Sequence, residues 1–168
     1  SALELANSQE KSNLISMIAA TYTEKGDFES ALDYIEDAIN RTNEDKFKFQ
    51  KATIYMAMDQ HGKAVTLLDA LLDDNPNHEE ILLNRAESHM ALKQYDLAKE
   101  DFSTLQSFAP NDPRSYYRLA HIAKEQNQNG EEFDNYTLFL KYVDRESVPA
   151  EELKRIETRM KQLPGSTE

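Results

Sequence analysis

Residues 52–76, ATIYMAMDQHGKAVTLLDALLDDNP, and residues 86–110, AESHMALKQYDLAKEDFSTLQSFAP, are two versions of one pattern. Each begins at an alanine and ends at a proline, with apolar residues three or four positions apart between them. An internal alanine keeps nearly the same interval, since Ala31, Ala64 and Ala98 follow one another at almost equal spacing. A period of about 34 positions is typical of a solenoid of helical hairpins, in which each hairpin buries its apolar side against the next. Such a chain usually serves as a binding surface.

Glycines and prolines mark the breaks between the expected helices. Gly26 is placed in a turn before a helix that Asp27 can cap, and Gly62 is predicted to form a similar turn in the segment Gln-His-Gly-Lys. Prolines interrupt the longer connections, because proline ends a helix. No segment alternates apolar and polar residues, so the sequence predicts an all-α protein. The nine expected helices span residues 9–25, 28–41, 44–59, 62–73, 78–92, 95–108, 113–127, 131–144 and 149–163.

The composition is that of a folded helical protein with an acidic surface. The chain has 168 residues, of which 39% are hydrophobic and 30% charged, with a formal net charge of −12. That charge repels phosphate backbones and makes nucleic acid an unfavourable partner. No apolar run is long enough to cross a membrane. The absence of cysteine excludes disulfides, thiolate nucleophiles and zinc–cysteine sites. We therefore expect a protein or peptide partner.

The start of the chain leaves the cellular compartment open. Ser1 is not an initiator methionine, so we expect the sequence to be a trimmed or processed piece of a longer protein. A cytoplasmic location is slightly favoured, and a periplasmic one is possible if an upstream signal was removed. The segment containing Leu3, Leu5 and Ala6 either begins the first helix early or is a frayed terminus.

Small and bulky residues recur at fixed positions in each hairpin. Alanines recur on the first helix of each pair (Ala19, Ala52, Ala86, Ala120) and on the second (Ala31, Ala64, Ala98). Larger residues follow one turn later: Ile35, Leu68 and Phe102. This order of small, aromatic and proline positions resembles the tetratricopeptide repeat over about residues 12–145. The resemblance implies a right-handed superhelical solenoid of antiparallel helix pairs. We expect one domain over residues 1–168, with repeats at about 12–44, 45–78, 79–112 and 113–146.

The fourth repeat departs from the pattern in its second helix. Glu132 stands where alanine is expected, and a shift of one residue would place Phe133 there instead, so we expect a degenerate repeat that packs differently. The aromatic residues of this helix are Phe133, Tyr136, Phe139 and Tyr142. The last segment, about 149–163, carries Leu153, Ile156, Met160 and Leu163 on one face. Solenoids need a terminal helix to cover their last apolar face, so we expect a capping helix, with a dimer contact as the alternative.

The sequence carries no recognisable catalytic or cofactor motif. There is no glycine-rich phosphate loop and no serine in a strand–turn–helix elbow. The four histidines (His61, His78, His89, His121) form no i,i+4 pair, and His89 occupies a packing slot that is tyrosine in two other repeats. A calcium-loop-like stretch near Asn129 fails because Tyr136 stands where the bidentate glutamate is needed. Asp96 with Lys99, and Glu151 with Arg155, have spacings suited to ion pairs. We expect no enzyme activity, metal or cofactor.

The resemblance implies that the first helices of successive pairs line a concave groove. The apolar side chains that this places in the groove are Met17, Phe49, Met56, Leu83, Met90 and Tyr117. The polar side chains beside them are Gln50, Thr53, Asn84, Glu87, Arg114, Arg118 and His121. Three of the six apolar residues are methionines, which adapt well to varied partners. The groove is predicted to bind a peptide or helix of a partner protein.

Two alternative functions remain open. Family members that act as chaperone adaptors hold a C-terminal carboxylate with a clamp of lysine, asparagine and arginine. Asn84, Arg114 and Arg118 match part of that clamp, but Phe49 and Thr53 stand at two of its positions. The chain could instead be a regulatory or scaffold segment of a larger multidomain protein. It is otherwise expected to be a monomer or a weak homodimer.

Overall fold

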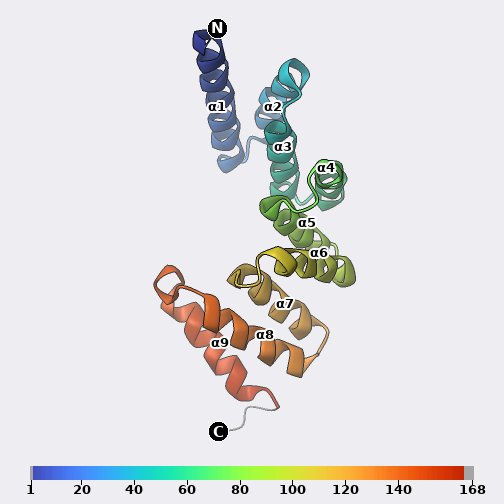
Figure 1. Cartoon of the computed structure of the whole chain (residues 1–168), viewed down its shortest axis with the longest axis vertical. Coiled ribbons are helices and arrows are strands. Elements are labelled where there is room, and N and C mark those ends of the chain that lie inside the picture. The colour runs from blue at the N-terminus through green and yellow to red at the C-terminus, as the bar shows by residue number, and fades with distance from the viewer. Residues whose placement is uncertain (1, 165–168) are drawn as a thin grey trace. The chain divides into compact units, whose positions relative to one another are not determined.

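The computed structural model describes residues 2–164, with side chains described for residue 7 and for residues 9–164. Within that range all regular structure is helical (Figure 1), as the sequence predicts. The helices are α1 (Ala2–Glu24), α2 (Phe28–Thr42), α3 (Asp45–Ala57), α4 (His61–Asp74), α5 (Glu79–Ala91), α6 (Tyr95–Phe108), α7 (Pro113–Glu125), α8 (Asn129–Tyr142) and α9 (Ala150–Gln162), with a 3₁₀ turn η1 (Arg145–Ser147). None of the described helices is both long and apolar enough to traverse a bilayer.

The helix boundaries agree with the sequence pattern except at the start. The second to ninth expected helices begin and end within about two residues of the observed ones. The first was expected at 9–25 and instead begins at Ala2, which is the early start considered for the segment around Leu3. The side chains of Leu3, Leu5 and Ala6 lie outside the described residues.

The chain forms two compact units, which divide between Gln94 and Tyr95. The first contains α1–α5 and the second contains α6–α9, so the division falls between the two helices of the third expected repeat. The single domain expected over residues 1–168 stays a prediction. In the first unit α1 packs with α2 and α3 with α4, and α3 also contacts both α1 and α5. The first helices of successive pairs therefore lie side by side.

The recurrent alanines are the points where these helices touch. All seven, from Ala19 to Ala120, are fully buried, and so are Ile35, Leu68 and Phe102. In the first unit one core cluster joins α1, α2 and α3, and a second joins α3, α4 and α5. A larger side chain at these alanines would hold the helices apart, because protein interiors are close-packed. The packing roles inferred from spacing are confirmed.

The turn inside each hairpin has the same backbone geometry. Gly26, Asp59, Lys93 and Asn127 all have positive φ, between 57° and 76°. In each turn, the residue after the one with positive φ donates its backbone N–H to a carbonyl of the preceding helix. Gln60 N–H donates to the Tyr55 carbonyl at 2.8 Å, and Gln94 N–H donates to the His89 carbonyl at 2.8 Å. This is the pattern of a Schellman cap. The prediction that Gly62 forms the second turn is wrong, because it lies inside α4 and Asp59 holds the left-handed position.

The second helix of the fourth repeat keeps the register of the others. Glu132, Tyr136 and Phe139 are buried, and each lies one repeat period after a buried residue of α6. The proposed shift to Phe133 is therefore wrong. Glu132 is tolerated at an alanine position because both of its carboxylate oxygens accept hydrogen bonds from Arg159 of α9, each 2.8 Å long.

The last helix covers the apolar end of the second unit. Ile156 is 2% exposed and belongs to one core cluster with Ala120, Tyr136 and Phe139. Leu153 and Met160 pack against the same cluster, and Leu163 is buried. The capping role expected for this segment is confirmed.

Candidate functional site

The predicted groove residues lie on two surfaces, one in each compact unit. We call the surface on α1, α3 and α5 the first face; its residues are Met17, Phe49, Gln50, Thr53, Met56, Leu83, Asn84, Glu87 and Met90. We call the surface on α7 the second face; its residues are Arg114, Tyr117, Arg118 and His121.

Hydrogen bonds fix the polar side chains in the middle of the first face. The Gln50 side-chain amide donates to the Ser16 carbonyl of α1 at 2.7 Å and so ties two neighbouring first helices together. The Thr53 hydroxyl donates to the Gln50 carbonyl at 2.8 Å. The Asn84 amide donates to the Glu80 carbonyl at 2.7 Å. The first of these bonds joins α1 to α3, and the other two lie within α3 and within α5.

The apolar members of the first face differ in exposure. Met17 is 66% exposed, and its neighbour Leu14 is 57% exposed. Met56 and Met90 are partly exposed, and Met56 also packs on the core cluster of α3–α5. Leu83 is only 8% exposed, so its side chain serves mainly in packing. Met17, Met56 and Met90 are thus exposed or partly exposed apolar side chains of this face.

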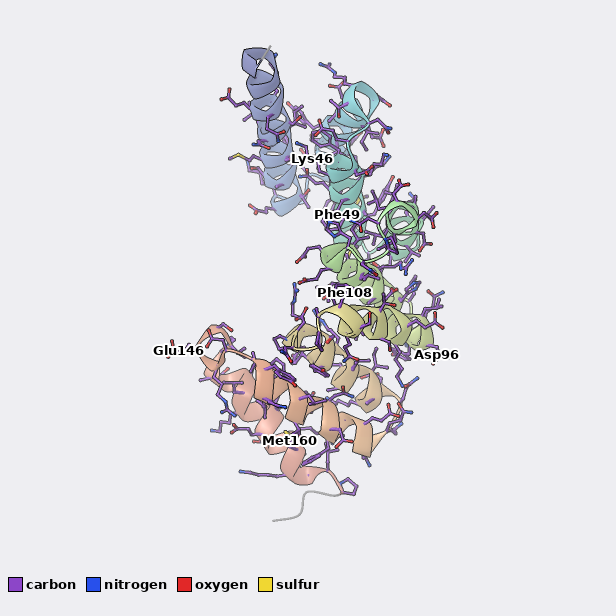
Figure 2. All side chains as sticks on the ribbon, viewed as in Figure 1. Lys46, Phe49, Asp96, Phe108, Glu146 and Met160 are labelled. Atoms are coloured by element: carbon purple, nitrogen blue, oxygen red, sulfur yellow. The ribbon has the colours of Figure 1, made fainter. Side chains whose placement is uncertain are left out.

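Phe49 borders a small hollow at one end of α3. The hollow has a volume of about 250 Å³. Phe49, Leu71 and Ile81 supply its apolar wall, and Lys46 and His78 are among its polar residues. Figure 2 labels Phe49 and Lys46, which both project from α3. Because Phe49 also packs on the core of α3–α5, its removal would disturb the fold as well as the surface.

A carboxylate that the sequence analysis did not identify links α1 to the start of α3. Glu44 accepts a hydrogen bond from the buried Ser12 hydroxyl at 3.0 Å, and its other oxygen lies 3.1 Å from the Lys46 ammonium. The Lys46 ammonium, with the hydrogen bond from Ser12, lowers the pKa of Glu44 below its usual value. The sequence gives little indication of this contact, because Ser12 and Glu44 are 32 residues apart.

The second face is a packed aromatic cluster with a basic edge. The Tyr117 hydroxyl donates to Glu152 of α9 at 2.9 Å, and its ring contacts His121 at 4.6 Å and Phe139 at 5.2 Å between centroids. Burial, with help from Glu152, raises the pKa of Tyr117. Burial and the charge of Arg118 lower the pKa of His121. Neighbouring Tyr136 is affected more strongly, since burial raises its pKa to about 12.

The three clamp-like residues are engaged in other contacts. Asn84 lies in the first unit, whereas Arg114 and Arg118 lie in the second. The Arg114 guanidinium makes a two-pronged contact with Asp112, the residue that caps α7, at 2.8–3.2 Å. The Arg118 guanidinium lies 5.8 Å from the centre of the Tyr117 ring. Lys48 and Lys51, the nearest lysines to the missing positions, pair with Asp45 and Glu36.

The remaining chemical candidates have structural roles. His89 is 7% exposed and its Nδ1 lies 2.8 Å from the Gln94 side-chain oxygen, as expected for a packing residue. Among the described side chains, those of residue 7 and residues 9–164, no three His, Asp or Glu are grouped to hold a metal. The two basic residues expected to pair with Asp96 and Glu151 have other partners. Lys99 lies 3.4 Å from Glu131 of α8, and Arg155 lies 3.4 Å from Glu152.

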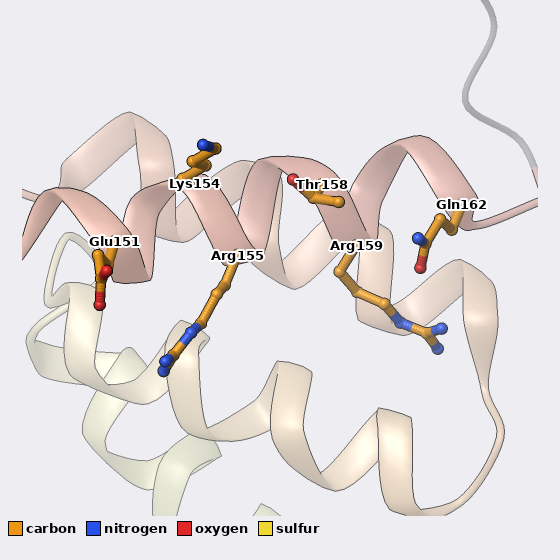
Figure 3. A pocket seen from close by; sticks show the side chains of 6 residues that line it. All are labelled: Glu151, Lys154, Arg155, Thr158, Arg159 and Gln162. Carbon is orange, nitrogen blue, oxygen red and sulfur yellow. The ribbon is translucent and has the colours of Figure 1, made fainter.

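A second hollow runs along the outer surface of α9. Its volume is about 370 Å³. Figure 3 shows the side chains that line it, all from this helix: Glu151, Lys154, Arg155, Thr158, Arg159 and Gln162. Three of the six are basic, which is unusual in a chain with a net charge of −12.

Stacked helix pairs with buried alanines at the crossings and uniform turns define a helical repeat protein that binds other proteins. Two sequence profiles, both described as tetratricopeptide repeat, match residues 13–45 and 55–122, together more than half of the chain. The chain belongs to the tetratricopeptide-repeat family. Its fold makes it a protein–protein interaction module, and members of this family generally act as scaffolds rather than catalysts.

Solved structures of tetratricopeptide-repeat proteins share the fold. MamA 41-end from Desulfovibrio magneticus RS-1 is 21% identical with a TM-score of 0.70, over 90% of this chain and 92% of that one. A repeat protein from Parabacteroides merdae is 19% identical with a TM-score of 0.74, over 89% of this chain and 59% of that one. The first repeat domain of Spaghetti (RPAP3), bound to the HSP90 peptide SRMEEVD, is 16% identical with a TM-score of 0.62, over 70% and 94%. No curated protein matches the sequence significantly.

Proposed function

We propose that the first face binds an extended peptide or a helix from a partner protein. The observation that carries the proposal is the methionine on each of three consecutive first helices. Met17, Met56 and Met90 lie on α1, α3 and α5, which pack side by side in one compact unit. Methionine side chains conform to varied apolar partners at little cost in strain.

The polar residues between the methionines support the same function. Gln50, Thr53 and Asn84 are each held by a hydrogen bond to backbone, so their positions are set before binding. A preorganised wall loses less conformational entropy when a partner is bound. The related fold of Spaghetti (RPAP3) carries a peptide of HSP90, which adds support from a distant relative.

The proposal is tested with peptides selected from a random phage-displayed library against the whole chain. We expect Met17→Glu to weaken the selected peptides at least tenfold, because it places a charge on an exposed apolar anchor. The matched control is Leu97→Glu, which changes a residue 43% exposed on the second helix α6. Equal effects of the two changes, or no effect of Met17→Glu, would contradict the proposal.

A second arm addresses the carboxylate clamp. The same peptides are compared with a free and with an amidated C-terminus. Because Arg114 is already paired with Asp112, and Phe49 and Thr53 replace one lysine and one asparagine of the clamp, we expect amidation to change the affinity less than threefold. A loss of more than tenfold on amidation would favour the chaperone-tail adaptor instead.

A further inference from the structure

The capping helix extends the wall formed by α7. The Tyr117 hydroxyl of α7 donates to Glu152 of α9 at 2.9 Å, and Ile156 of α9 shares a core cluster with Ala120 of α7. The two helices therefore lie together on one side of the second unit. Side chains of α9 can consequently act with those of the second face.

Arginines from both helices lie around this contact. The Arg118 guanidinium of α7 is 5.8 Å from the centre of the Tyr117 ring. On α9, Arg155 Nη1 is 3.4 Å from the Glu152 oxygen that Tyr117 does not use. The carboxylate of Glu152 is thus held between a phenol hydroxyl and a guanidinium.

We propose that this α7–α9 surface, formed by Tyr117, Arg118, Lys154 and Arg155, binds an acidic segment of a partner protein, and that Glu152 holds the place of the partner's carboxylate until it binds. The inference goes beyond the proposed function, because α7 and α9 belong to the second unit and the first face belongs to the first.

The contact that holds Glu152 to Arg155 is weak enough to be exchanged. The Arg155 side chain is 74% exposed, and at 3.4 Å the pair is a long surface ion pair. Exposed pairs of this kind contribute little to stability, since water screens them. A partner segment with a second carboxylate that reaches Lys154, which also lines the hollow in Figure 3, would gain a second cation.

The charges of the residues at this hollow favour an acidic partner segment over a basic one. Of the three basic residues that line the hollow, Arg159 is neutralised by Glu132 through two bonds of 2.8 Å, whereas Lys154 and Arg155 lie on its exposed side. The chain as a whole, with a net charge of −12, repels such a segment, whereas the exposed cations Lys154 and Arg155 attract it locally. A basic segment would be attracted to the acidic chain as a whole, so it would have no reason to prefer this site.

The test measures fluorescence anisotropy of a labelled peptide of alternating glutamate and serine, added to the whole chain in 0.15 M salt, where charges interact over about 8 Å. A peptide with glutamine in place of glutamate is the ligand control. We expect the acidic peptide to bind at least tenfold more tightly than the glutamine peptide. Arg155→Gln should weaken it at least fivefold.

Glu152→Gln distinguishes this inference from simple charge attraction at any arginine. The amide oxygen still accepts the Tyr117 hydrogen bond but no longer neutralises Arg155, so binding of the acidic peptide should strengthen at least threefold. The matched control is Arg145→Gln, an exposed arginine that pairs with Glu157 at 3.3 Å and should leave binding unchanged.

Three results would overturn the inference. The first is an equal loss for Arg155→Gln and Arg145→Gln, and the second is weaker binding after Glu152→Gln. The third is a dimer in light scattering that Arg155→Gln dissolves, because the occupant would then be a second copy. The proposed function is judged separately, since Met17→Glu lies in the first unit and can still abolish binding of the selected peptides.

Discussion

Arg159 of the capping helix reaches the fully buried carboxylate of Glu132 with two hydrogen bonds of 2.8 Å. Glu132 stands where the three preceding repeats have a buried alanine. The terminal repeat thus departs from the others at this alanine position, and the residue there is matched to the helix that covers it. Figure 3 shows Arg159 extending from α9.

Removing one partner of this pair is predicted to cost more than removing both. Arg159→Ala leaves a buried carboxylate without a counter-charge, and we expect a loss of up to about 3 kcal/mol, at the low end for buried pairs because Arg159 is one-third exposed. The double variant with Glu132→Ala restores the alanine of the other repeats and should recover part of the loss. Urea unfolding of the two single variants and the double variant measures this coupling. Additive losses would show that the pair is not coupled.

We predict that a glycine substitution in one of the hairpin turns increases the stability of the chain. Lys93 has φ of 60°, a left-handed conformation that costs an L residue about 1–2 kcal/mol and glycine almost nothing. Lys93→Gly should therefore stabilise the chain by up to about 1 kcal/mol, after the entropy lost by glycine. Asn127→Gly is the matched comparison, and it should gain less because asparagine tolerates this conformation. Thermal melts in which Lys93→Gly lowers the midpoint would contradict the turn assignment.

Substitutions at two alanines of α4 can distinguish the effect of core packing on stability from the effect of helix propensity. Ala64 is fully buried at a helix crossing, whereas Ala70 is exposed. We expect Ala64→Leu to overpack the crossing and to cost about 1–3 kcal/mol. Ala70→Leu should change the free energy of unfolding little, since both residues favour helix. If the two variants melted alike, the alanine period would reflect helix propensity alone.

Acid is predicted to destabilise the second unit through His121. Burial, Arg118 and Lys124 lower the folded-state pKa of this histidine below its ordinary 6.5. The unfolded chain therefore takes up its proton first, and stability is lost as the pH falls from about 6.5 through the folded pKa. Urea unfolding at pH 7.5 and pH 5.5 should show a smaller difference for His121→Phe than for the unaltered chain. An identical difference would exclude His121 as a source of the pH dependence.

The repeat period predicted most of the fold because each packing position recurs in the same form. The buried alanines and the residues that follow them, such as Ile35 and Phe102, could be found from spacing alone. The same spacing could have found Asp59, Lys93 and Asn127, which recur at the repeat period starting from Gly26. Residue type favours Gly62, because glycine is the usual turn residue, but the position in the repeat period predicts the turn correctly.

The contacts that the sequence could not predict occur once each. Glu132 with Arg159 and Tyr117 with Glu152 join residues 27 and 35 positions apart. They depend on where the capping helix lies, and it begins three residues later than the repeat period would place a next first helix. The sequence also could not predict how exposed each groove residue is, because Leu83 and Met90 lie on one helix but differ in burial.

The most direct test of a binding surface on α1, α3 and α5 uses the five methionines as probes. Met17, Met56 and Met90 belong to the first face, whereas Met58 packs in the core of α1–α3 and Met160 in the core of the second unit. Carbon-13 methyl spectra are recorded while a library-selected peptide is added to the whole chain. Our account predicts that the signals of Met17, Met56 and Met90 shift while those of Met58 and Met160 stay in place. Shifts confined to Met58 or Met160, with the other three unchanged, would contradict it.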